Sequence, residues 1–477
     1  MSASSPSPPQ ERAPRRIAVV GGGISGLSAA YFLSRPPGAA QVTVFEASSH
    51  WGGIIVTEEG GGFVMEGGPD SFLAAKPEAA ELCRQLGLRD ELMETRPSHR
   101  RSYTWWEGSF YPLPTGILNP PIRLRELAGS PLLSPQGRER AAREPEIPAG
   151  GGEDESVGDF FHRRFGREVV RRIAEPLLAG VFGGGVDEIS MQAAFPRLCR
   201  YEQLHGCLCL RDTSDQAAES REAAPSSPFL TLRGGLATLV EALLRDCRRS
   251  GVELRSGRPV QALRPARRES PPAPFLLDLE EGEEAFDAVV MALPAPASAK
   301  LLAPAWPDLA DALASVDYSP AVLGALAYSG EVPQGRPGSG FIIPPSAGRD
   351  LLACTWVHQK WRRRAPRGHS LLRGYLAGEP ARRMLQAEDA KVISLLRREF
   401  LDLMDVRQDP VLSRVWKLPQ ALPVYRLGHR SRMAALKKGL QEVKGLTCIG
   451  NYLDGVGLPD CIRQARQAAR ALASDAS

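Results

Sequence analysis

Three glycines near the start of the chain have the spacing that lets a backbone bind phosphate groups. Gly21, Gly23 and Gly26 fit the pattern G-x-G-x-x-G. The first permits a tight turn, the second lets the backbone approach a pyrophosphate, and the third lets a helix pack closely on a strand. The N–H groups at the start of that helix and the positive end of its dipole then favour negative charge. The pattern predicts a nucleotide site.

An acidic residue lies where the ribose of such a nucleotide is expected. Glu46 stands twenty residues after Gly26. A carboxylate at this position accepts hydrogen bonds from both ribose hydroxyls, and it would repel a 2′-phosphate. The spacing therefore predicts an unphosphorylated ribose and disfavours NADP.

The elements that must position these residues follow from the apolar pattern. Residues 17–20 are a short apolar run that suits a buried parallel strand, and the apolar residues of 24–35 recur at helical spacing. Residues 41–46 form a second strand, so the segment predicts a β–α–β unit. Further along, we expect helices over 157–200 with a break at 183–185, a helix over 236–249, strands at 251–254, 275–280, 285–293 and 446–450, alternation over 318–376, a last helix from near Asp460, and loops at 134–156 and 212–228.

The order of these elements predicts an α/β protein with a discontinuous Rossmann-like nucleotide-binding domain, a mixed-sheet substrate domain and a helical insert. The predicted parts are a disordered tail at 1–16, the nucleotide-binding domain at 17–95, 229–295 and 405–477, the helical part at 96–228, and the substrate-binding part at 296–404. Polar stretches rich in Pro, Gly and Ser separate several of them.

Composition narrows the class of protein. The 477 residues are 43% hydrophobic and 24% charged, which is ordinary for soluble globular proteins, and the net charge of +4 argues against a nucleic-acid binder. No uninterrupted apolar run reaches the roughly 18 residues of a membrane span, and the Ser/Pro-rich start does not resemble a secretory signal. The eight cysteines form no CxxC pair and only seven histidines occur, so neither disulfides nor a metal site is expected.

The sequence after the second strand extends the nucleotide pattern. His50 and Trp51 precede the pair Gly52 and Gly53. Together with the β–α–β unit, this stretch resembles the amine-oxidase-like flavoprotein superfamily, in which the two glycines pass close to the cofactor. The superfamily usually has Arg where this chain has His50, so a phosphate contact from that side chain is not carried over. The resemblance implies FAD, rather than NAD, as the cofactor.

Four further segments resemble protoporphyrinogen oxidases and the related coproporphyrinogen oxidases. They are EGGPDSFL at 66–73, EPLLAGVFGGGVDEISMQAAFP at 175–196, FLTLRGGLATLVE at 229–241 and GNYLDGVGLPDCIR at 450–463, in the order of the family. In the last segment, glycines let the backbone crowd a ring system, and a helix N-terminus lies near a reduced flavin. By resemblance, the FAD contacts fall on Gly21, Gly22, Gly23, Ile24, Ser25, Gly26, Glu46, Ala47, Gly52, Gly53, Gly67, Gly68, Pro69, Asp70, Val260, Trp416, Val456, Gly457 and Leu458.

The resemblance also implies a reaction. A porphyrinogen would be oxidised to a porphyrin in a six-electron reaction of heme biosynthesis, with FAD as acceptor and O2 as final oxidant; protoporphyrinogen IX is the first expected substrate. Because the flavin supplies the chemistry, we expect no catalytic acid or base among the side chains. The substrate is an apolar disc with carboxylate arms, and Arg101 falls near the family's substrate arginine. It would pair with a propionate.

Location and assembly are less constrained. The resemblance implies a cytoplasmic enzyme, and both a homodimer and peripheral contact with the inner face of the cell membrane stay open. ILNPPIRL at 117–124 mixes apolar residues with arginines, which suits a shallow interfacial contact. The alternative is a loop packed on its own domain.

Three other functions remain open at this stage. The substrate could be coproporphyrinogen III, whose four propionates call for a more basic cavity. The same flavin domain also occurs in amine oxidases and carotenoid desaturases. A non-catalytic nucleotide-binding protein is the third alternative, and a purified protein without bound flavin would favour it.

Overall fold

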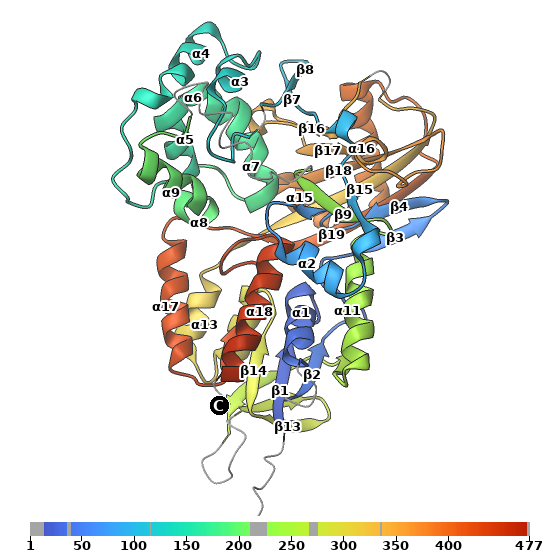
Figure 1. Cartoon of the computed structure of the whole chain (residues 1–477). Coiled ribbons are helices and arrows are strands. Elements are labelled where there is room, and N and C mark those ends of the chain that lie inside the picture. The colour runs from blue at the N-terminus through green and yellow to red at the C-terminus, as the bar shows by residue number, and fades with distance from the viewer. Residues whose placement is uncertain are drawn as a thin grey trace, which may run out of the picture.

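The computed structural model describes residues 14–35, 40–114, 116–209, 227–266, 275–333 and 336–474. Helices and sheets are mixed throughout (Figure 1), so the predicted α/β class is confirmed. Residues 1–13 of the predicted tail and residues 212–226 of a predicted loop lie outside the described residues. Arg15 and Arg16 were expected in the tail, but they begin the first strand because they pair with Ala40 and Gln41.

A parallel five-stranded sheet lies at the base of the molecule in Figure 1. Val20 pairs with Phe45, so the first two strands end at the same edge of the sheet. The sheet joins distant parts of the chain, as the predicted discontinuous fold requires. In spatial order its strands are β10 (Glu253–Ser256), β2 (Ala40–Glu46), β1 (Arg15–Val20), β14 (Ala288–Met291) and β20 (Leu446–Cys448).

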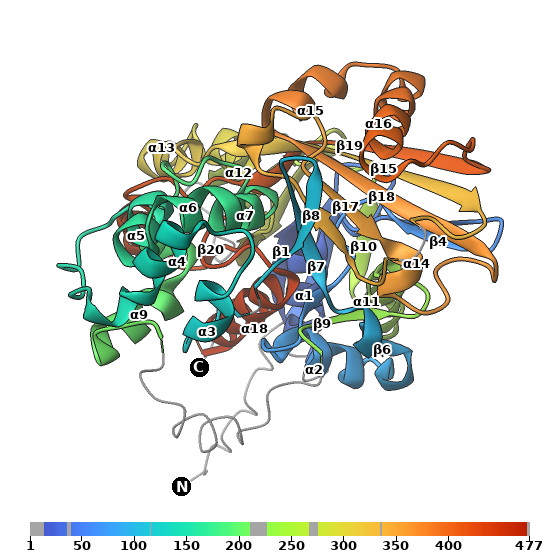
Figure 2. The same ribbon diagram turned by 90° about the horizontal axis from the view of Figure 1, so that it is seen from above.

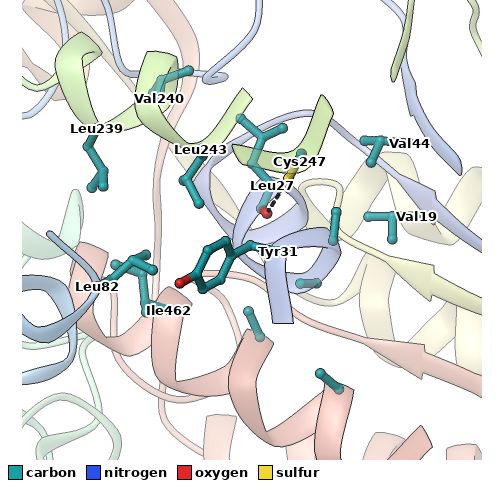
Figure 3. Close-up of a cluster of buried hydrophobic side chains, with 14 of the residues drawn as sticks. Val19, Leu27, Tyr31, Val44, Leu82, Leu239, Val240, Leu243, Cys247 and Ile462 are labelled. Carbon is teal, nitrogen blue, oxygen red and sulfur yellow. Dashed lines mark hydrogen bonds between the residues drawn. The ribbon is translucent and has the colours of Figure 1, made fainter. Parts of the chain in front are cut away.

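Alternate side chains of this sheet enter two different cores, as the period of a strand dictates. Ile17 and Val19 of β1 face one core, whereas Ala18 and Val20 face the other. Figure 3 shows part of the first core, where the ring of Tyr31 points toward Leu82 and Ile462. The helices that build this core are α1 (Ile24–Leu33), α2 (Glu78–Gln85), α11 (Ala237–Arg249) and α18 (Leu458–Ser474).

The second core lies on the opposite face of the sheet. A three-stranded antiparallel sheet covers it together with three helices. The predicted strand at 285–293 is two strands, because the chain turns at Asp287 between an antiparallel and a parallel pairing. The elements are β11 (Ala262–Pro265), β12 (Phe275–Leu279), β13 (Gly282–Phe286), α12 (Ala295–Leu302), α13 (Pro307–Ala314) and α17 (His429–Gln441).

A seven-stranded mixed sheet forms the upper right of Figure 1. One face packs on α15 (Gly378–Leu385) and α16 (Asp389–Met404), and the other face meets the hairpin of β3 (Thr57–Gly60) and β4 (Phe63–Glu66). In spatial order the strands are β19 (Leu412–Pro423), β15 (Tyr318–Ser329), β18 (His369–Ala377), β17 (Ala353–Trp356), β16 (Gly340–Ile342), β7 (Ser102–Trp106) and β8 (Ser109–Pro112). α14 (Val357–Lys360) follows β17 in the sequence.

The helical insert lies beside this sheet in Figures 1 and 2 and has its own core. The predicted break after residue 182 is confirmed, since Gly183 ends α7 with φ of 63°. The predicted loop at 134–156 is partly wrong: α4 begins there because Ser134 caps it by accepting a hydrogen bond from Gly137 N. The insert's helices are α3 (Leu124–Ala128), α4 (Pro135–Ala142), α5 (Val157–Phe165), α6 (Arg167–Val169), a π-helical stretch (Val170–Ala174), α7 (Glu175–Phe182), α8 (Met191–Ala194) and α9 (Pro196–His205).

A small three-stranded sheet joins segments that lie far apart in the sequence. β9 (Phe229–Leu232) lies between β5 (Phe72–Leu73) and β6 (Leu92–Glu94), and both pairings are antiparallel. β9 is thereby tied to residues 72–94.

The sheets cut across three predicted domain borders. β7 and β8 fall in the range expected to be helical, but they join the seven-stranded sheet through β16. β19 falls in the range expected for nucleotide binding, but it pairs along β15. α12 and α13 fall in the expected substrate part, but their apolar faces pack into the second core of the five-stranded sheet. Backbone pairing with strands distant in sequence fixes the membership of the strands, and apolar packing fixes that of the two helices.

The apolar residues of 117–124 point inward. Ile117 and Ile122 are buried in the core of the helical insert. The packed loop, rather than the interfacial contact, is therefore what the structure shows for this segment. No helix within the described ranges is long and apolar enough to cross a membrane.

Candidate active site

The glycine loop between β1 and α1 has the geometry of a phosphate cradle. Gly21 N donates to Phe45 O at 2.8 Å, which ties the loop to the end of β2. A side-chain Cβ on Gly26 would lie 1.9 Å from Gly21 O, so only glycine allows α1 to approach the strand this closely. The first hydrogen bond within the helix runs from Leu27 N to Gly23 O. The N–H groups of the residues between them therefore lie at the free end of the helix.

Glu46 holds this loop from the end of β2. One carboxylate oxygen accepts a hydrogen bond from Gly22 N at 2.8 Å, and the other accepts from Ser48 N and Ser48 Oγ at 2.9 Å. A carboxylate has about four lone-pair sites, so the two oxygens keep capacity for further donors. The residue thus lies at the loop as the spacing predicted, and its bond to a ribose stays a prediction.

The second glycine pair meets the first loop backbone to backbone. Gly52 N donates to Gly22 O at 2.9 Å, and Gly23 and Gly52 form a parallel bridge. A Cβ on Gly53 would lie 3.3 Å from the Cα of Gly23. A ring nitrogen of His50 lies 3.2 Å from Ile55 O. The side chain of His50 therefore contacts the turn that carries the glycines.

The late glycine turn closes the loop region from another side. α18 begins at Leu458 and packs along α1. Asp460 lies in its first turn, is buried, and accepts hydrogen bonds from Gly457 N at 3.2 Å and from Lys76 Nζ at 2.6 Å. Val456 packs against the core of the helical insert. The turn therefore connects the glycine site with the insert.

The segment after β4 lies between the hairpin and the seven-stranded sheet. Gly67 N donates to Val56 O at 2.8 Å. A Cβ on Gly67 would lie 2.6 Å from the ring of Trp416, so the backbone rests directly on the indole. Trp416 is mostly buried, and its Nε1 donates to Glu58 at 2.7 Å. The structure thus brings Gly67 and Trp416 together, although 349 positions separate them in the sequence.

Val260 lies close to the end of β2. Arg258 N donates to Glu46 O and Gly257 N donates to Ser48 O, each at 2.9 Å. Val260 follows this contact and packs half-buried against the second core. Val260, a predicted FAD contact, therefore lies on the same side as Glu46, the predicted ribose residue.

A comparison with known proteins assigns the family. A family model described as flavin containing amine oxidoreductase matches residues 24–473. The chain belongs to this family. It is therefore an oxidoreductase that uses FAD.

The flavoenzyme is also similar to individual proteins over nearly its whole length. It is 31% identical to the coproporphyrinogen III oxidase of Bacillus subtilis (strain 168), over 95% of this chain and 97% of that protein. It is 28% identical to the chloroplastic protoporphyrinogen oxidase of Oryza sativa subsp. japonica, over 98% and 90%. A solved structure from Exiguobacterium sp. 255-15, provisionally named protoporphyrinogen oxidase, matches with a TM-score of 0.83 at 27% identity, over 97% and 99%.

The residues of the flavoenzyme fit an FAD at the predicted place. The nearest atom to a Cβ on Gly23 is 3.9 Å away, so the cradle is open at this glycine while it is closed at Gly26. Glu46, Val260 and the start of α1 surround the same end of β2. We predict that the glycine backbone holds FAD there, and contacts of FAD with residues 67–70 and 456–458 stay a prediction.

Arg101 is placed differently from the cofactor residues. It lies just before β7, its side chain is exposed, and its carbonyl accepts a hydrogen bond from Ser339 N at 2.8 Å. These contacts put it at the seven-stranded sheet rather than at the glycine loop. Its role toward a propionate stays a prediction.

Five charged residues that lie together were not singled out as a group by the sequence. Glu66, Asp70, Lys360, Arg364 and Arg373 form what we call the buried charge cluster; four of these side chains are at most 16% exposed, and Arg373 is half-buried. A cavity of about 10 Å³, room for about one water molecule, is lined by four of them. The signal that could have found the cluster is a charge inside an apolar strand, the arginine of LLRGYLA at 371–377.

Proposed function

We propose that this flavoenzyme oxidises a porphyrinogen to a porphyrin, with FAD as the electron acceptor and O2 as the final oxidant. The observation that carries the proposal is similarity over nearly the full length to proteins named for this oxidation. Two of the four segments that resemble the family, at 66–73 and 450–463, lie at the glycine site. The proposal therefore rests on sequence similarity together with the place of these segments in the fold.

In each of three steps, bound FAD would accept two electrons and one proton from the macrocycle and would pass the electrons to O2. Conversion of a porphyrinogen to a porphyrin removes six electrons and six protons. Three O2 molecules would take them up as three molecules of H2O2, so the reaction balances without another oxidant.

In this proposal the protein binds and orients FAD and the porphyrinogen, and it excludes water from the site. The glycine loops and Glu46 hold the nucleotide end in place through backbone contacts. Val456 joins the late glycine turn to the apolar core of the helical insert, so the insert covers that side of the site. A covered apolar site suits a substrate whose macrocycle is apolar.

No side chain needs to act as an acid or base in this proposal. In each of the three steps one hydrogen leaves as a hydride equivalent to the flavin, and one leaves as a proton that the formation of H2O2 takes up. Arg101 would contribute binding, since a guanidinium pairs with a propionate in a charge-assisted hydrogen bond. Its exposed position suits contact with a carboxylate arm at the rim rather than with the macrocycle.

We propose coproporphyrinogen III as the preferred substrate and protoporphyrinogen IX as the alternative. The relative named for the first is 31% identical, and the relative named for the second is 28% identical. This small difference reverses the order that we expected from the sequence. Both substrates share the macrocycle, so the difference lies in how their carboxylates are bound.

Assays of the purified protein with each porphyrinogen separately test both the oxidation itself and the substrate preference. We expect a yellow protein, porphyrin fluorescence that rises with time, and H2O2 in a ratio of three to one porphyrin. A higher kcat/KM with coproporphyrinogen III supports the preferred substrate, and a higher value with protoporphyrinogen IX reverses it. A flavin-loaded protein that oxidises neither porphyrinogen but oxidises an amine or a polyene would overturn the proposal.

The assembly and location proposed from the resemblance are those of a cytoplasmic enzyme. Membrane contact through 117–124 is not part of the proposal, because Ile117 and Ile122 are buried. Light scattering would show whether a homodimer forms, and co-sedimentation with anionic vesicles would show whether another surface binds lipid.

A further inference from the structure

One face of the seven-stranded sheet carries a cation where its neighbours are apolar. On β18, Leu371, Arg373 and Tyr375 alternate onto the face that meets the β3–β4 hairpin, whereas Leu372 and Leu376 enter the opposite core. Such a face normally holds apolar residues, since a charge there must be compensated. The presence of Arg373 on this face therefore calls for a structural or functional explanation.

Three cations of the sheet region each contact one residue of the stretch 66–70, which runs from the last residue of β4 into the segment that follows it. Arg364 pairs with Glu66 at 3.3 Å, Arg373 donates to Gly68 O, and Lys360 pairs with Asp70 at 2.8 Å. The contacted residues, at 66, 68 and 70, alternate along the chain, so the three cations contact one side of this stretch. The indole of Trp416 lies against Gly67.

Further hydrogen bonds tie Arg364 and Glu66 to neighbouring elements. Arg364 is almost fully buried and donates to Leu232 O at 2.8 Å and to Thr231 Oγ1 at 3.1 Å. Glu66 accepts from Leu236 N at 3.0 Å and from Thr57 Oγ1 at 2.7 Å. Arg364 and Glu66 are thus both tied to the segment at 231–236. Arg373, by contrast, contacts Gly68 from β18, a strand in the interior of the seven-stranded sheet.

The buried charge cluster contains more positive than negative charge. Three cations face two carboxylates, which leaves one net positive charge when both carboxylates are ionised. Burial opposes the charged form of Asp70, but Lys360 and Arg373 hold the pKa of its carboxyl well below the ordinary value. Burial raises the pKa of Glu66, although Arg364 opposes this shift. Protonation of Glu66 would only add to the positive excess.

We propose that Arg373 is a positioning residue that fixes the flavin-lining segment 67–70 through Gly68 and places a net positive charge behind it. The inference rests on the proposed contact between this segment and FAD. A reduced flavin carries negative charge, so the positive excess stabilises the reduced form and raises the flavin's midpoint potential. Arg373 thereby tunes electron uptake without touching the substrate.

Two variants and one matched control test the inference on the flavin-loaded enzyme. Arg373→Gln removes the charge, Arg373→Lys keeps it, and Arg349→Gln removes an arginine of the same domain that pairs with Glu399 at 2.6 Å. The readouts are the dissociation constant of FAD, the midpoint potential of the bound flavin and the melting temperature. Of these readouts, the midpoint potential would not respond to a purely structural role.

We expect Arg373→Gln to raise the FAD dissociation constant by roughly tenfold or more, because the segment proposed to contact FAD loses the charge-assisted hydrogen bond that holds it. We also expect a more negative potential; a tenfold change in the reduction equilibrium corresponds to about 30 mV. Arg373→Lys should keep the potential near the wild-type value. Arg349→Gln should lower the melting temperature alone.

Two results would overturn the inference: an unchanged affinity and potential in Arg373→Gln, or equal shifts in Arg349→Gln. If Arg373→Gln does not fold, a wild-type potential in Arg373→Lys supports the inference and a lowered one contradicts it. Failure of the proposed function is seen separately, as a wild-type enzyme that binds FAD but oxidises neither porphyrinogen.

Discussion

Gly23→Ala and Gly26→Ala add the same methyl group to one loop, yet they should impair the protein at different steps. At Gly26 the new Cβ would lie 1.9 Å from Gly21 O, whereas real contacts stay above about 3.0 Å. The backbone must therefore move by at least about 1.1 Å, the difference between these distances. Overpacking of this kind costs about 1–3 kcal/mol of folding free energy, and the cradle is distorted as well.

At Gly23 the protein itself has room for the methyl group. The nearest atom would be 3.9 Å away, and the backbone has φ of −73°, which alanine adopts freely. Loss of a good N-cap and the gain from a stiffer unfolded chain nearly cancel, so the folding free energy should change by no more than about 0.5 kcal/mol. The methyl group would instead occupy the space of the pyrophosphate. A clash of about 1–3 kcal/mol weakens FAD binding by roughly 5- to 150-fold.

Thermal unfolding of the flavin-free proteins and FAD titration of each variant separate the two effects. We expect Gly26→Ala to lose stability and FAD, and Gly23→Ala to keep its stability and lose FAD. Normal FAD affinity in a stably folded Gly23→Ala protein would refute the placement of the pyrophosphate at this loop. A marked loss of stability in Gly23→Ala would refute the claim that the space is open.

Three further changes have outcomes set by the contacts. Glu46→Ala removes charge-assisted hydrogen bonds at the loop, so FAD affinity, measured by fluorescence titration, should fall by roughly 10-fold or more. Arg164→Met leaves a fully buried Glu144 unpaired and should cost about 3–5 kcal/mol in denaturant unfolding, whereas Arg143→Ala on an exposed pair should change stability by no more than about 0.5 kcal/mol. Burial lowers the pKa of His429 to about 4, so the unfolded chain takes up a proton at higher pH than the folded protein does, and stability should fall as pH drops from about 6.5 to 4. His429→Gln should flatten that pH dependence, and an equally steep loss in this variant would contradict the assignment.

The local parts of the fold could be predicted because short-range rules govern them. The β–α–β unit predicted over 17–46 forms where the apolar pattern placed it, since its strands and helix are contiguous, and its first strand begins two residues earlier. The same rules missed α4, because a polar stretch rich in arginine looked like a loop although Ser134 and Pro135 start a helix there. They also missed the membership of β19, since pairing along β15 leaves no mark in the local pattern.

By itself, the sequence determined the glycine loop and the place of Glu46 beside it, where we expect the nucleotide to bind. Glycine spacing and the position of Glu46 act over a few residues, where backbone geometry leaves few alternatives. Only the tertiary structure decided what surrounds that site. Gly67 lies on Trp416, and Arg373 contacts Gly68 O across 305 positions, because two sheets pack face to face. Contacts between distant segments depend on the packing of whole elements, so no local pattern of residues specifies them.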